Sequence, residues 1–179
     1  CIRDSLVPVS NLGYPVSPKF NYAKTAVLED AACTVGVLVD GVHVGADGHA
    51  CAWSFHGRKI LTTGEGGMLT TDDAELTEDS RAFKHFGFRP AKPREVCAVK
   101  GTNAKMSNIL AAVGRVQLGR HEETIRMRAE KAKVYDDLFK TWGDHPFSFP
   151  RPPKNVRYNW LCYVVQAPSG VIRDRVVYG

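Results

Sequence analysis

The chain has 179 residues and a mass of 19.7 kDa, enough for one domain with a buried core. Hydrophobic residues make up 44% and charged residues 24% of it, which excludes a wholly disordered protein. The apolar runs are shorter than the roughly 20 residues that a membrane span needs, and the net charge of +5 would suit an anionic ligand.

The distribution of the charges argues against a nucleic-acid interface. Many of them lie between residues 115 and 140, where Lys and Arg alternate with five acidic residues: Glu122, Glu123, Glu130, Asp136 and Asp137. Such mixing is typical of a solvated helix face with near-neighbour ion pairs. We therefore expect small-molecule ligands, and neither nucleic acid nor a membrane, as partners.

Five cysteines are present, at positions 1, 33, 51, 97 and 162. They are odd in number and widely spaced, and no C-x-x-C pair occurs, so neither a disulfide framework nor a zinc ribbon is indicated. Free thiols in a reducing cytoplasm fit this pattern best.

In chain order, short apolar runs predict strands at residues 26–29, 50–55 and 68–71. Residues 31–37 either begin a helix or run on toward a turn at Asp40-Gly41. Asp72-Asp73 offers an N-cap for a helix that Gly87 ends.

The second half of the chain is mostly helical by its pattern. Apolar residues recur at spacings of three and four from 107 to 142, and Gly119 divides this run into two helices. A proline-flanked linker at 146–153 follows, and residues 161–165 begin a new strand. Short strands that alternate with helices predict an α/β layered domain over residues 1–145 and a second domain that begins within 146–179.

One stretch combines residues that could carry chemistry. Trp53-Ser-Phe-His-Gly-Arg-Lys59 runs directly into a segment rich in glycine, and four glycines lie between positions 57 and 67. Glycine lets the backbone approach a ligand closely or adopt positive φ. From the spacing alone, a glycine-rich turn with a solvated lysine remains the simpler interpretation. A Walker-type phosphate loop is excluded, since no G-x-x-x-x-G-K-[ST] occurs.

His43, His49, Cys51 and His56 are close enough in sequence to suggest zinc. His49 and Cys51 would face the same side of a strand, whereas the other two lie on predicted loops. Nothing marks a third group that would orient a Cys-His nucleophile pair. We therefore expect loop histidines and no metal site.

Three segments together resemble a known family: Val27-Leu-Glu-Asp30-Ala-Ala, Ser54 through Met68, and Gly101-Thr-Asn103 leading into residues 106–112. They are similar to the DegT/DnrJ/EryC1/StrS family of sugar aminotransferases, which depend on pyridoxal 5'-phosphate (PLP). The resemblance implies the fold type I three-layer αβα sandwich. Residues 1–145 would be part of the large PLP-binding domain with its connecting helices. Residues 146–179 would be a linker and the beginning of a small C-terminal α/β domain.

Family members are much longer, and this chain opens on Cys1 and ends in mid-pattern. We therefore expect it to be a piece of a longer protein, poorly folded and inactive when expressed alone.

The resemblance also implies roles for individual residues. Lys59 matches the lysine that forms a Schiff base with PLP and moves the proton, and Asp30 matches the carboxylate that pairs with the pyridine nitrogen. Ser54 matches a hydroxyl donor to the cofactor phosphate. Asn103 matches an asparagine that reaches the phosphate of the neighbouring subunit, which implies a homodimer with shared active sites.

Departures from the family pattern affect the same site. Cys33 stands where the family usually has Gln or His near the 3'-oxygen of PLP, and a thiol is a poor hydrogen-bond donor. The common Asn-Tyr-Arg is Asn103-Ala104-Lys105, which replaces a fork-shaped cation by a point charge. The common Gly-Asp before the lysine-bearing strand is Gly48-His49.

These matches imply a PLP-dependent aminotransferase of the cytoplasm that moves an amino group from L-glutamate to a nucleotide-linked keto-sugar. Within the same family, a PLP-dependent dehydratase and an aminobenzoate-type synthase are alternatives. The dehydratases carry His in place of the lysine, so Lys59 disfavours them, whereas the synthases keep the lysine. A non-catalytic PLP-binding partner subunit is the third alternative.

Overall fold

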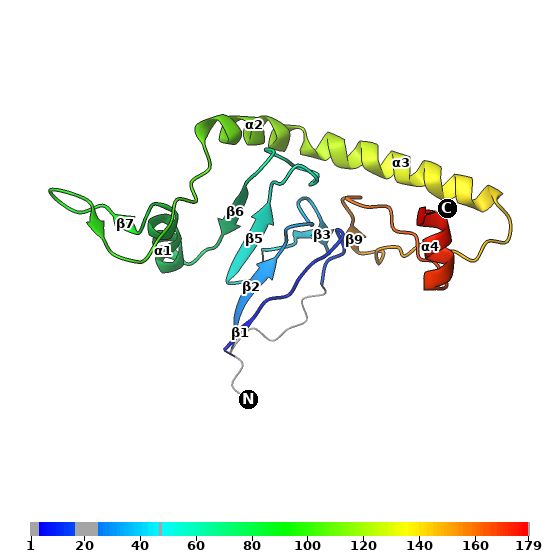
Figure 1. The fold of residues 1–179 in the computed structure, drawn as a ribbon, viewed down its shortest axis with the longest axis horizontal. Coiled ribbons are helices and arrows are strands. Elements are labelled where there is room, and N and C mark those ends of the chain that lie inside the picture. Colours follow the sequence, from blue (N-terminus) through cyan, green and yellow to red (C-terminus); the bar gives the residue numbers. More distant parts are fainter. Residues whose placement is uncertain (1–3, 17–24, 47, 179) are drawn as a thin grey trace.

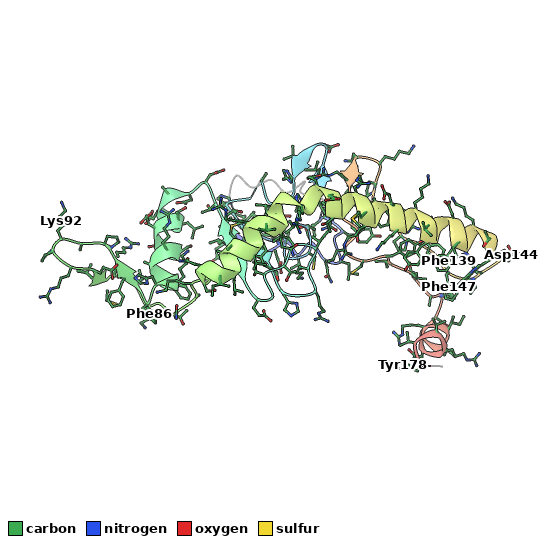
Figure 2. All side chains as sticks on the ribbon, turned by 90° about the horizontal axis from the view of Figure 1, so that it is seen from above. Phe86, Lys92, Phe139, Asp144, Phe147 and Tyr178 are labelled. Carbon is green, nitrogen blue, oxygen red and sulfur yellow. The ribbon has the colours of Figure 1, made fainter. Side chains whose placement is uncertain are left out.

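The computed structural model describes residues 4–16, 25–46 and 48–178. Its elements are β1 (Ser5–Leu6), β2 (Ala26–Asp30), β3 (Leu38–Val39), β4 (Val42–His43), β5 (Ala50–Ser54), β6 (Gly67–Thr70), α1 (Ala74–Lys84), β7 (Phe88–Arg89), β8 (Val96–Cys97), α2 (Asn108–Gly119), α3 (His121–Thr141), β9 (Val156–Arg157) and α4 (Gly170–Tyr178). The molecule is elongated, with the main sheet near its middle and α2 and α3 running along one side (Figure 1). Seen from above, Phe86 and Lys92 lie toward one end, and Asp144 and Tyr178 toward the other (Figure 2).

The main sheet has the strand order β1-β2-β5-β6. β1, β2 and β5 are parallel, while β6 returns antiparallel to β5. The predicted strands at 26–29, 50–55 and 68–71 are confirmed, with ends that differ by one residue. In Figure 1, β2 and β5 point toward the long helices, so their carboxyl ends share one edge of the sheet.

Residues 31–37 form consecutive turns and not a helix. Thr34 N donates to Ala31 O at 3.0 Å, and Val37 N donates to Thr34 O at 2.9 Å. The chain then enters a tight hairpin, β3–β4, at the predicted turn. Asp40 and Gly41 have φ of 52° and 83°, as a type I′ turn requires.

Side-chain caps mark where helices α1 and α2 start. The Asp73 carboxylate accepts a hydrogen bond from Leu76 N at 3.0 Å, and the Ser107 hydroxyl accepts one from Leu110 N at 3.3 Å. α1 ends at Lys84, after which Gly87 N donates back to Ala82 O. The predicted division of the long helical run is confirmed, because α2 ends on Gly119.

The strand predicted at 161–165 is wrong. At the start of this segment, side chains bind the backbone: Arg128 Nη1 donates to the carbonyls of Trp160 and Leu161, and Leu161 N donates to Asn159 Oδ1. Buried polar backbone must be paired, and here side chains supply the pairing instead of a neighbouring strand. The division of the chain into domains at residue 146 stays a prediction.

The best-buried cluster lies beside the carboxyl edge of the sheet, at the start of the hairpin. Its buried members are Ala31, Val37, Val44 and Cys51, and Val39, Trp53 and Val156 pack against them. This core therefore joins the 31–37 turns, β5 and β9. Within the described ranges, none of the helices combines the length and apolar character that crossing a membrane requires.

Candidate active site

Asp30 is the last residue of β2. It pairs in register with Ala52 of the parallel strand β5. Its backbone N–H donates to Pro8 O at 2.9 Å, and its carbonyl accepts from Ser10 N at 3.0 Å. Its carboxylate oxygen Oδ1 accepts from Ala32 N at 3.0 Å. The sheet edge therefore presents a half-buried carboxylate at the strand ends, where open α/β sheets bind ligands.

Ser54 and Lys59 follow from the adjacent strand. Ser54 ends β5, and its hydroxyl accepts from His56 N at 3.4 Å. A turn then returns the chain, with Lys59 N donating to His56 O at 2.9 Å. The lysine side chain reaches the neighbouring loop, where Nζ lies 3.0 Å from Cys33 Sγ. The structure thus brings Lys59 together with Cys33, three residues beyond Asp30.

The glycines of this region allow close packing of the lysine-bearing loop. Gly66 has φ of 146°, and a Cβ there would lie 2.6 Å from Met106 Cε and 2.9 Å from Thr63 Oγ1. Because Met106 Cε is the end of a flexible side chain that can move aside, the positive φ is the main reason for glycine at this position.

Two residues that sequence reasoning missed hold the loop at 31–37. The buried Asn159 donates from Nδ2 to Cys33 O and Val35 O, both at 3.0 Å. Arg157 donates from Nη2 to Gly36 O at 3.0 Å and forms a two-pronged ion pair with Glu122. No local pattern marks these residues, because their partners are backbone carbonyls more than 120 residues away in sequence.

Asn103 lies elsewhere. It is exposed and pairs through its backbone with His85, just beyond α1. Next to it, Lys105 Nζ lies 2.7 Å from His85 Nδ1 and 4.9 Å from the centre of the Phe86 ring. In the described part of the chain, no hydrogen bond joins Asn103 to Asp30, Ser54 or Lys59. No hydrogen bond in the described residues therefore links Asn103 to the site of its own chain.

Two of the residues considered for zinc, His49 and Cys51, are engaged elsewhere in the fold. His49 Nδ1 accepts from Val27 N at 3.0 Å, and Cys51 is buried in the core, where desolvation raises the pKa of its thiol to about 12. Among the residues that the structure describes, no group of three or more His, Cys, Asp or Glu side chains is arranged to hold a metal ion.

The donor set at the sheet edge fits the chemistry of PLP. An amine that can form a Schiff base, a carboxylate for a protonated ring nitrogen and a hydroxyl for a phosphate are what this cofactor needs, and Lys59, Asp30 and Ser54 supply them in one place. The individual role of each residue stays a prediction.

Comparison with known proteins covers most of the chain. A model of the DegT/DnrJ/EryC1/StrS aminotransferase family matches residues 21–177. GDP-perosamine synthase of Caulobacter vibrioides is 35% identical over 153 residues, which are 84% of this chain and 41% of that protein.

Solved structures of aminotransferases are also similar to this chain. The aminotransferase TlmJ of Streptoalloteichus hindustanus is 30% identical with a TM-score of 0.86, over 96% of this chain and 48% of that one. A DegT DnrJ EryC1 StrS aminotransferase of Brucella abortus is 28% identical with a TM-score of 0.76, over 91% of this chain and 44% of that one. The chain therefore spans less than half the length of these relatives. The predicted fold, a partial domain of the fold type I class, is confirmed.

Proposed function

Since the chain belongs to the DegT/DnrJ/EryC1/StrS aminotransferase family, we propose that the protein transfers an amino group from L-glutamate to a nucleotide-linked keto-sugar, with PLP as its cofactor. The observation that carries this proposal is the position of Lys59. Its amine lies at the carboxyl edge of the parallel strands, 3.0 Å from the thiol of the loop that follows Asp30. The family is PLP-dependent, and the site offers the groups that PLP needs.

Bound PLP supplies an electron sink that stabilises negative charge at the carbon next to the amino nitrogen. In our proposal, Lys59 holds the cofactor and later carries the proton to and from the reacting carbon. The Asp30 carboxylate keeps a proton on the ring nitrogen by its negative charge. The Ser54 hydroxyl, at the end of β5, donates to the phosphate. Each residue thus acts through one group that the sheet edge already orients.

The nucleotide is the finer part of the proposal. The relatives named GDP-perosamine synthase, from Caulobacter vibrioides and Escherichia coli O157:H7, are 35% and 39% identical over their matched regions. They support a GDP-linked keto-sugar as the first substrate to try. Lys105, in place of the family's arginine, is a point charge and not a planar fork, so it would bind an anionic substrate group with less directional preference.

We further propose a cytoplasmic homodimer in which Asn103 serves the partner's site. Two features support this proposal. Asn103 is exposed on a segment apart from its own Lys59, and α2 presents apolar side chains to solvent: Ile109 is 77% exposed and Val116 56% exposed. Exposed apolar surface of this kind is typical of an interface. Cys33, Cys51, Cys97 and Cys162 are free thiols, which supports a reducing compartment, whereas Cys1 lies outside the described residues.

The test is an isotope-transfer assay. The protein is purified at the full length of its relatives, of which this chain spans less than half, and is incubated with PLP, 15N-labelled L-glutamate and a panel of GDP-, dTDP- and UDP-linked keto-hexoses. We expect equal amounts of 2-oxoglutarate and of a 15N-labelled amino sugar with at least one nucleotide, and none with Lys59→Ala. If PLP is bound but no keto-sugar accepts nitrogen, the sugar aminotransferase proposal fails. Loss of an oxygen from the sugar without nitrogen transfer would indicate a dehydratase instead.

A further inference from the structure

Asn159 is the best-buried amide close to the candidate site. Its side chain is fully buried, at 0% exposure. It forms three hydrogen bonds of 3.0 Å: Nδ2 donates to Cys33 O and to Val35 O, and Oδ1 accepts from Leu161 N. Both N–H groups of Nδ2 therefore donate to the loop that follows Asp30.

The orientation of this amide is determined by its surroundings. Two carbonyl oxygens face Nδ2 and one N–H faces Oδ1, so a flipped amide would set oxygen against oxygen and nitrogen against nitrogen. The space is tight as well, because a Cβ at Gly13 would lie 2.6 Å from Asn159 Oδ1. The neighbouring Tyr158 is 4% exposed and packs against Tyr14 at 4.8 Å between ring centres. The amide thus has one allowed position.

The loop depends on such support because it has no regular secondary structure. Its own bonds are short-range: Ala32 N to Asp30 Oδ1, Thr34 N to Ala31 O and Val37 N to Thr34 O. These bonds close turns, and the backbone ties the loop to the fold at its two ends, where Ala31 N donates to Ala52 O at 3.0 Å and Val44 N donates to Val37 O at 3.1 Å. Asn159 ties down two of its carbonyls, and Arg157 ties down a third, Gly36 O, at 3.0 Å.

We propose that Asn159 is a positioning residue, which sets Cys33 and Asp30 relative to the Lys59 amine. It acts through the loop backbone and does not contact the substrate. The inference rests on the proposed function, because a transferase site needs the lysine and the carboxylate held in a single geometry while a proton moves. A residue after the linker thereby determines the geometry of a site formed at residues 30–59.

The test compares Asn159→Asp with Asn155→Asp, two identical substitutions four residues apart. Asn159→Asp keeps the shape and the Oδ1 acceptor but replaces the donor by an oxygen that faces two carbonyls. Asn155 is exposed, and its Nδ2 donates to the Asp40 carboxylate at 3.0 Å, so its variant places a similar repulsion outside the loop. Asn159→Ser, which adds no charge, serves if the aspartate variant does not fold.

Two readouts are taken for each variant. Amide hydrogen exchange without PLP is expected to speed up at least about tenfold in residues 31–37 of the Asn159 variant, and to stay unchanged in β5. With PLP, kcat for amino transfer is expected to fall about tenfold, while KM for glutamate changes little, because Asn159 does not touch the substrate. Asn155→Asp is expected to change neither readout.

Unchanged exchange in residues 31–37 would overturn the proposal, as would exchange that rises equally across the sheet. Faster exchange of the loop with normal kcat would also overturn it, since the loop would then be loosened without consequence for the site. If the wild-type protein transfers no amino group at all, the proposed function fails. The exchange comparison still decides in that case whether Asn159 holds the loop.

Discussion

The loop at 31–37 and the segment at 101–105 both carry predicted cofactor-binding residues, but the fold holds them in opposite ways. Around Cys33 the loop is buried, with Ala31 and Thr34 at 0% exposure, and Asn159 bonds to it from 126 residues away in sequence. Asn103 is exposed, and the contact that the structure describes for it is a backbone bridge to His85 beside α1. This contrast fits the proposal that Lys59 and Asp30 serve the site of their own chain and Asn103 serves the site of a partner.

The two regions also differ in what surrounds them. The 31–37 loop packs on the buried cluster of β5 and the hairpin. The segment with Asn103 leads into α2, which has no buried side chain in the described structure although most of its residues are apolar. A helix of that composition gains stability only when another surface covers it. If a partner subunit supplies that surface, it also receives Asn103.

The largest effect on amino transfer is expected from Lys59→Ala, at the site beside the buried loop 31–37. Losing the amine removes both the covalent attachment and the proton carrier, so amino transfer should fall about 10⁴-fold or more while PLP still binds non-covalently. Lys133→Ala, on an exposed face of α3, is the matched control and should leave the rate unchanged. The rate of 2-oxoglutarate formation is the measurement, and appreciable turnover by Lys59→Ala would remove Lys59 from the chemistry.

Asp30→Asn is expected to have the next largest effect. The asparagine keeps an oxygen for the bond from Ala32 N, so the loop stays in place and only the charge is lost. Charge stabilisation of this kind is worth roughly 3 kcal/mol, or about a hundredfold in rate. The turnover number should therefore drop much more than the affinity for PLP, as fluorescence titration of the cofactor would show. Near-normal turnover would contradict the role of the carboxylate.

The proposed role of the exposed Asn103 in the partner's site is tested by mixing subunits. Lys59→Ala and Asn103→Ala proteins are each impaired, but in a mixed dimer one site has neither defect. Equal mixing with free exchange gives intact sites in about a quarter of the total, so about a quarter of wild-type activity should return. Subunit exchange is followed with two fluorescent labels. If the labels exchange and activity does not return, Asn103 serves its own chain's site.

The smallest effect concerns pH and the packing behind the loop. Burial lowers the pKa of His121 below its ordinary value of 6.5, partly opposed by the nearby Glu122 carboxylate. Its ring lies against the loop, since a Cβ at Gly36 would come within 2.5 Å of Nε2.

As the pH falls below 6.5, His121 becomes protonated in the unfolded chain before it does in the folded chain. The free energy of unfolding therefore decreases from pH 6.5 down to the lowered pKa of His121 in the folded chain. Glu122, whose pKa is lowered mainly by its hydrogen bond to Arg157, loses its contribution in a separate window, below its ordinary value of 4.5. Urea unfolding at pH 7.5 and 5.5 should show a smaller loss for His121→Gln than for the wild type. Equal losses would mean that His121 is not buried against the loop.

Local patterns in the sequence predict much of this fold. The strands predicted at 26–29 and 50–55, the cap at Asp72-Asp73 and the break at Gly119 all depend on residues close together in sequence. The same holds for the meeting of Asp30 with the Lys59 loop, because parallel strands bring their carboxyl ends to one edge.

Long-range partners account for what the sequence does not predict. Residues 161–165 have the composition of a strand, but the side chains of Arg128 and Asn159 bind the backbone at residues 160 and 161. The role of Asn159 is hidden for the same reason, since a single asparagine carries no pattern and its partners are carbonyls of a distant loop. The contact between Lys59 and Cys33 likewise depends on how that loop is held.

The central claim, that Lys59 is the residue that holds PLP, can be tested most directly by borohydride reduction. The protein is incubated with PLP, reduced, digested and mapped by mass spectrometry. The account predicts a phosphopyridoxyl group on the peptide that contains Lys59, with no such modification in the Lys59→Ala variant. Labelling that maps to another lysine, or that persists unchanged in Lys59→Ala, would contradict it.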